Sequence, residues 1–209
     1  NCISVLFNEQ KRFREAIEYS DKAESKAIAI NDTIERLSAH ANKGAILMRQ
    51  GNYRKSVNSL TPLWNMVKQA NYNVLTLKYL SPLLKSYLQL GKADSVAFYL
   101  TYANEACRNL APTSNGVLGI LEIKADLLGQ QKKYAEQWLL LDSIGRLAGT
   151  NLTMPKDKLL ATQARCLNNM GKYTQAYQAM QKAYMKSDSL KQSDIDKQLS
   201  EFNIKYKTL

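Results

Sequence analysis

A turn-like motif recurs along this chain at an interval of about 40 residues. Its clearest copy lies in residues 169–180, NMGKYTQAYQAM, where a glycine and a tyrosine two residues later sit between helix-like stretches. Taking the first residue of each copy as an anchor, the five anchors are Lys11, Gly51, Gly91, Lys132 and Gly171. Unrelated turns do not keep such a period, so the spacing predicts an architecture of stacked repeats.

Other columns of the repeat agree with these anchors. Seven residues before the anchor and five after it, most residues are small or apolar: Gly44, Leu84, Ala125 and Ala164 before, and Ala16, Ser56, Val96, Gln137 and Ala176 after. Between anchors, apolar residues recur every three or four positions, which is typical of helices. We therefore expect each unit to hold two antiparallel helices, named here the A helix before the anchor and the B helix after it. Glycine suits the left-handed backbone that ends a helix, whereas Lys11 and Lys132 should be strained there.

The chain resembles the tetratricopeptide repeat family in three features. These are the small residue before the turn (Gly44, Ala125, Ala164), the Gly-x-Tyr turn (Gly51/Tyr53, Gly171/Tyr173) and the later alanines (Ala16, Ala23, Ala103, Ala176, Ala183). The resemblance implies an all-α fold, a right-handed α-α superhelix of about five helix pairs with a long C-terminal helix. The unit of about 40 residues is longer than the usual 34 of that family. The repeat domain is expected over residues 1–187, and the C-terminal helix over residues 188–209.

The C-terminal stretch carries an apolar seam with heptad spacing. Its members are Ile195, Leu199, Phe202, Tyr206 and Leu209. The seam predicts either a dimer or stalk contact or a helix that covers the open face of the last repeat. The ending also resembles the membrane-proximal end of Bacteroidetes-type regulators, in which an extracytoplasmic repeat region precedes a membrane span and a histidine kinase or helix-turn-helix output. That resemblance implies a periplasmic sensor region in signal transduction, such as a two-component system, with its membrane anchor outside this chain; a cytoplasmic location is the alternative.

The net charge of +11 raises the question of a polyanionic partner. No run of five or six like charges and no RNA-binding signature is present, so we expect no nucleic-acid binding by this region. The three cysteines lack the spacing of a disulfide framework or a zinc site. No stretch of about 18 apolar residues occurs, which predicts no membrane span within the chain.

The sequence offers little that could support catalysis. His40 is the only histidine, and it stands where later repeats carry Leu80, Leu121 and Leu160, so we expect a half-buried core residue. No nucleophile, phosphate-binding or metal-protease motif is present. Trp64 and Trp138 stand at helical spacing and are expected to pack. The chain is predicted to have no enzyme activity, no cofactor and no metal.

A concave face lined by A helices is the expected binding surface of such an array. Nine residues are predicted to lie on it: Arg49, Lys78, Lys85, Glu122, Asp126, Lys158, Arg165, Asn168 and Asn169. Five of the nine are basic, which favours a protein or peptide partner that carries carboxylates. The alternative function is an assembly adaptor that forms a homodimer through the C-terminal seam.

Overall fold

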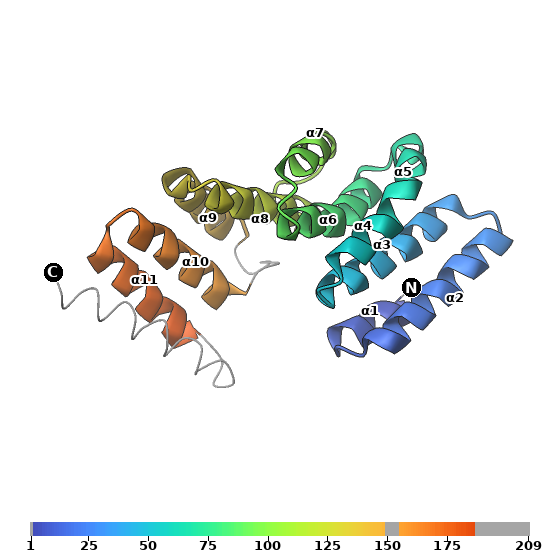
Figure 1. The fold of residues 1–209 in the computed structure, drawn as a ribbon, viewed down its shortest axis with the longest axis horizontal. Coiled ribbons are helices and arrows are strands. Elements are labelled where there is room, and N and C mark those ends of the chain that lie inside the picture. Colours follow the sequence, from blue (N-terminus) through green and yellow to red (C-terminus); the bar gives the residue numbers. More distant parts are fainter. Residues whose placement is uncertain (1, 149–154, 187–209) are drawn as a thin grey trace. The chain divides into compact units, whose positions relative to one another are not determined.

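The computed structural model describes residues 2–148 and 155–186, and the regular elements in these ranges are all helices, with no strand. This confirms the all-α prediction. In chain order the elements are α1 (Cys2–Glu9), α2 (Phe13–Ala29), α3 (Thr33–Arg49), α4 (Tyr53–Leu60), the short 3-10 helix η1 (Thr61–Leu63), α5 (Trp64–Ala70), α6 (Asn73–Gln89), α7 (Ala93–Arg108), α8 (Asn115–Gln130), α9 (Tyr134–Ala148), α10 (Lys156–Asn169) and α11 (Tyr173–Lys186) (Figure 1).

The chain forms two compact units, unit 1 (Asn1–Ile120) and unit 2 (Leu121–Leu209), and the boundary falls within α8. In unit 1, α3 packs against α2 before it and α4 after it, and α6 packs against α3, α4 and α7. In unit 2, α10 packs against α9 and α11. The helices α3, α6 and α10 therefore each contact both their own B helix and the B helix before it. The A helices are α1, α3, α6, α8 and α10.

The same turn closes each of the five helix pairs. Its anchor has a left-handed backbone in all five copies, with φ of 60° at Lys11, 77° at Gly51, 67° at Gly91, 59° at Lys132 and 75° at Gly171. At the second copy, the Gly51 N–H donates to the Met48 carbonyl and the Asn52 N–H donates to the Leu47 carbonyl, both at 3.0 Å. Equivalent bonds recur at the other four anchors. This pair of bonds is the Schellman motif, which satisfies the last carbonyls of a helix.

The two lysine anchors hold a conformation that costs an L-residue about 1–2 kcal/mol. We expect Lys132→Gly to raise the free energy of unfolding of unit 2 by about 1 kcal/mol, because glycine removes that strain at some cost in chain entropy. Gly171→Ala should lower it by about 1 kcal/mol, since an added Cβ meets no atom within 4 Å and only the backbone is affected. Urea denaturation in a Trp64→Phe background, followed by Trp138 fluorescence, measures both. A destabilised Lys132→Gly variant would contradict the assignment of strain.

Small residues let the two helices of a pair approach closely near each turn. The Ser56 hydroxyl of the B helix donates to the Gly44 carbonyl of the A helix at 2.9 Å. In the first pair the direction is reversed, because the Ser4 hydroxyl of the A helix donates to the Ala16 carbonyl of the B helix, also at 2.9 Å. Ala16, Ser56, Val96 and Ala176, all five residues after an anchor, are fully buried at 0% exposure. The core of each pair thus begins next to its turn.

Among the helices that the structure describes, proline interrupts the B helix of the second pair alone. At Pro62 the B helix of the second pair breaks into α4, η1 and α5, because proline lacks the N–H that an α-helix interior requires. The helix α6 runs on through Pro82 without such a break.

Candidate functional site

All nine predicted binding residues lie on A helices. Arg49 ends α3; Lys78 and Lys85 belong to α6; Glu122 and Asp126 belong to α8; Lys158, Arg165, Asn168 and Asn169 belong to α10. The first three lie in unit 1 and the other six in unit 2. Each unit therefore presents its own part of the predicted surface.

Glu122 departs from the predicted surface position. Its side chain is buried, at 5% exposure, whereas Asp126 one turn later is exposed. Glu122 stands ten residues before its anchor, and the residue at the same position in α3, Ala41, is also buried, at 1%. This position is thus covered by neighbouring packing, and Glu122 is not an exposed ligand-binding residue.

Successive A helices of unit 1 align in register. The Lys78 ammonium of α6 donates a hydrogen bond to the Ser38 hydroxyl of α3, and the two residues stand 40 positions apart, one repeat. We call the surface along these two helices the α3–α6 face. Its members are Ser38, Ala45 and Arg49 on α3 and Lys78, Ser81 and Lys85 on α6.

The α3–α6 face lies within a stretch without any acidic residue. Between Glu35 and Asp94 the sequence contains no Asp or Glu, but it contains the basic residues Arg36, Lys43, Arg49, Arg54, Lys55, Lys68, Lys78, Lys85 and Lys92. Arg36 and Lys43 face Glu24 and Asp21 of α2. Among the described residues, the other seven form no ion pair. A count of acids along the sequence would have identified this block.

Partial burial changes the pKa of Lys78, which lies on the α3–α6 face. Lys78 keeps an exposed flank, but α3 and α6 remove part of its hydration, and this desolvation lowers the pKa of Lys78 below its usual range. The Glu35 carboxylate acts in the opposite direction. The hydrogen-bond partner of Lys78 is the neutral Ser38 hydroxyl. The ammonium is thus partly dehydrated without a carboxylate bound to it.

The corresponding surface of unit 2 is mixed in charge. Lys158 and Arg165 stand on α10 and Asp126 stands on α8. The Arg165 guanidinium donates to the Thr162 hydroxyl at 3.2 Å, one turn away on its own helix. The side-chain carbonyl oxygen of Asn168 is buried and has no hydrogen-bond partner among the described residues.

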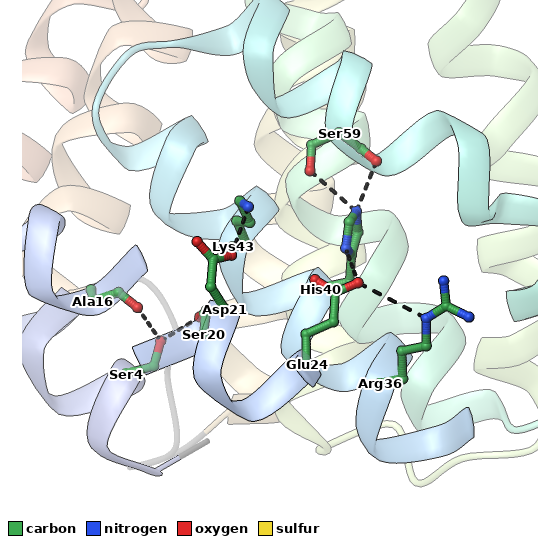
Figure 2. A network of polar contacts seen from close by, with 9 residues as sticks. All are labelled: Ser4, Ala16, Ser20, Asp21, Glu24, Arg36, His40, Lys43 and Ser59. Carbon is green, nitrogen blue, oxygen red and sulfur yellow. Dashed lines mark hydrogen bonds and ion pairs between the residues drawn. The ribbon is translucent and has the colours of Figure 1, made fainter. Parts of the chain in front are cut away.

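The single histidine belongs to a polar network that joins three helices (Figure 2). His40 of α3 places Nδ1 3.1 Å from a Glu24 carboxylate oxygen of α2, and Nε2 2.9 Å from the Ser59 carbonyl of α4. The His40 side chain is 15% exposed and is thus largely buried, in agreement with the expected core position. A second link, 2.6 Å long, joins the Lys43 ammonium to Asp21 of α2. The network therefore ties the first helix pair to the second.

Other groups relevant to chemistry are the potential metal ligands, the Cys166 thiol and the two tryptophans. No group of three His, Cys, Asp or Glu is placed to hold a metal ion in residues 2–148 and 155–186. The Cys166 thiol is buried beside Gln137, and burial raises its pKa to about 11. Trp64 packs edge-on against Tyr99 and Tyr102, and Trp138 packs on the core of unit 2.

Two further predictions concern membranes and the C-terminal stretch. None of the helices that the structure describes is both long and apolar enough to cross a bilayer. The C-terminal seam, Ile195, Leu199, Phe202, Tyr206 and Leu209, lies outside the described residues.

Comparison with models of known protein families finds no match to the chain, and comparison with curated proteins finds none either.

Proposed function

We propose that this chain is a non-catalytic binding region made of helical repeats, and that it holds a protein or peptide partner on the surface of its A helices. The observation that carries the proposal is the fivefold recurrence of one turn, with its two hydrogen bonds. Repetition of one helix pair along a chain builds an extended surface rather than an enclosed reaction site. A right-handed superhelix is the arrangement that we propose for the pairs.

The composition of the A-helix surface favours an acidic partner. Arg49, Lys78, Lys158 and Arg165 are exposed, and Lys85 is partly exposed. Carboxylates on a partner would pair with these cations at the rim of the interface, and such pairs act mainly on specificity and on the rate of association.

A sensor role extends this proposal to the full-length protein. Binding would shift the population of arrangements of the repeats, and the C-terminal stretch, residues 188–209, would carry that shift onward. The extracytoplasmic location, the membrane anchor and the signalling output rest on the resemblance in the C-terminal stretch alone.

A pair of double variants tests the proposal. We expect Lys85→Ala with Arg165→Ala to weaken binding of an acidic peptide at least tenfold in a calorimetric titration, because each unit loses one cation of the A-helix surface. The matched control is Arg54→Ala with Lys172→Ala, which removes the same charge from exposed positions just after the turns. Unchanged affinity in the first double variant would show that the A-helix surface is not the binding site.

A further inference from the structure

We propose that an acidic partner segment lies in extended conformation along the α3–α6 face of unit 1 and sets two carboxylates, three residues apart, on Lys78 and Lys85. This inference rests on the proposed function and makes it specific. It names the unit that binds, the two cations that hold the ligand and the spacing of the ligand's charges.

Charge favours unit 1 over unit 2. The α3–α6 face contains three basic residues, Arg49, Lys78 and Lys85, and no acidic one; Glu35, at the start of α3, is the carboxylate that acts on Lys78. In unit 2 the predicted surface is mixed in charge, because it contains the acidic Asp126 as well as the basic Lys158 and Arg165. Of these cations, Lys78 would be stabilised most by a bound anion, because its ammonium is already partly dehydrated and its hydrogen-bond partner is a neutral hydroxyl. A carboxylate bound to such a cation makes a stronger, charge-assisted hydrogen bond.

The spacing of the two lysines sets the spacing of the ligand's charges. Lys78 and Lys85 are seven residues apart on one continuous helix, so they project from the same face at an axial separation of about 10.5 Å. In an extended peptide, side chains three residues apart are separated by about 10 Å. Alternate side chains of a strand point to opposite sides, but the long lysine side chains reach carboxylates on either flank of the peptide.

The small, partly exposed residues Ser38 and Ala45 of α3 leave room for the peptide main chain. They stand at the positions that match Lys78 and Lys85, whereas Ala41 between them is buried. None of the six residues of the face is aromatic. Single-stranded nucleic acids depend on aromatic side chains for base stacking, so the composition of the face favours a peptide over a nucleic acid.

Two isomeric peptides provide the test. Both are nonapeptides of serine, alanine and glycine with blocked termini and two glutamates, placed at positions 3 and 6 in one and at positions 3 and 4 in the other. We expect the wild-type chain to bind the 3,6 isomer at least fivefold more tightly in a calorimetric titration. Lys78→Ala with Lys85→Ala should abolish that preference, whereas the control Arg54→Ala with Lys55→Ala, of equal charge, should keep it. Circular dichroism of each variant checks that the helices are intact.

The outcomes separate this inference from the function on which it rests. Equal affinity for the two isomers, or equal losses in both double variants, would overturn it. If Lys158→Ala with Arg165→Ala abolishes binding while the Lys78 and Lys85 variant retains it, the inference fails and acidic-peptide binding stands. If neither isomer binds at millimolar concentration, nor does a peptide of nine glutamates, the acidic-partner proposal fails as well. Binding of an oligonucleotide that exceeds that of both peptides would also overturn the assignment to a peptide.

Discussion

Replacing Tyr79 by alanine will lower the free energy of unfolding of unit 1 by about 4 kcal/mol, the loss typical of removing a buried aromatic side chain. Tyr79 is fully buried, at 0% exposure, on α6. Its hydroxyl donates a hydrogen bond of 2.6 Å to the Leu60 carbonyl. Burial raises the pKa of the Tyr79 phenol, so the hydroxyl keeps its proton and acts as a donor.

The hydroxyl of Tyr79 compensates for the break at Pro62. In η1 the Trp64 N–H bonds to the Thr61 carbonyl, in the 3-10 pattern, rather than to the Leu60 carbonyl of a regular α-helix. The Leu60 carbonyl then accepts from Tyr79 of the next repeat. Tyr79→Phe keeps the ring and loses this bond, so it should cost about 1 kcal/mol, the usual net contribution of one intramolecular hydrogen bond.

Urea denaturation followed by Trp64 fluorescence, in a Trp138→Phe background, measures both Tyr79 variants within unit 1. The difference between alanine and phenylalanine isolates the packing of the ring. A phenylalanine variant as stable as the parent would show that the Leu60 carbonyl does not need this bond.

Gly44→Ala is expected to lower the free energy of unfolding of unit 1 by about 2 kcal/mol, although alanine favours helices. Gly44 lies in the interior of α3, where α3 and α4 approach each other. A Cβ atom at Gly44 would stand 2.6 Å from the Leu60 side chain, which is itself fully buried. That contact is too short, so the helices must separate or Leu60 must leave its position.

Gly119→Ala is the matched control for the Gly44 variant. Gly119 also lies inside a helix of unit 1, α8, but an added Cβ would meet no atom within 4 Å. The gain in helix propensity then acts alone and should raise the free energy of unfolding by about 0.5–1 kcal/mol. Effects of the same sign in the two variants, measured by the same Trp64 fluorescence, would contradict the close approach at Gly44.

The repeat and its turns follow from local chemistry, which is why the sequence reveals them. A left-handed residue at a helix end is a property of one backbone position, and glycine at Gly51, Gly91 and Gly171 marks it directly. The period of the array then identifies Lys11 and Lys132 as the equivalent positions, and both have a left-handed backbone. The core position of His40 follows from the leucines at its position in later repeats.

The candidate site could be predicted only in part from these local sequence patterns. The helical period places Arg49, Lys78 and Lys85 on A helices, because the side of a helix is set by residue spacing. Whether a side chain at that spacing is covered depends on neighbouring helices, and for this reason Glu122 is buried although the pattern places it on the surface.

Local sequence is enough to show that the chain is helical, where each helix pair turns and which residues are small enough for close packing, since all three are encoded over a few consecutive residues. Tertiary packing sets the division into two compact units and the hydrogen bond between Lys78 and Ser38. It also determines that Tyr79 completes the hydrogen bonding of Leu60 in the preceding repeat. These contacts join residues 19 to 40 positions apart, and their partners are chosen by how whole helices pack, which no local pattern specifies.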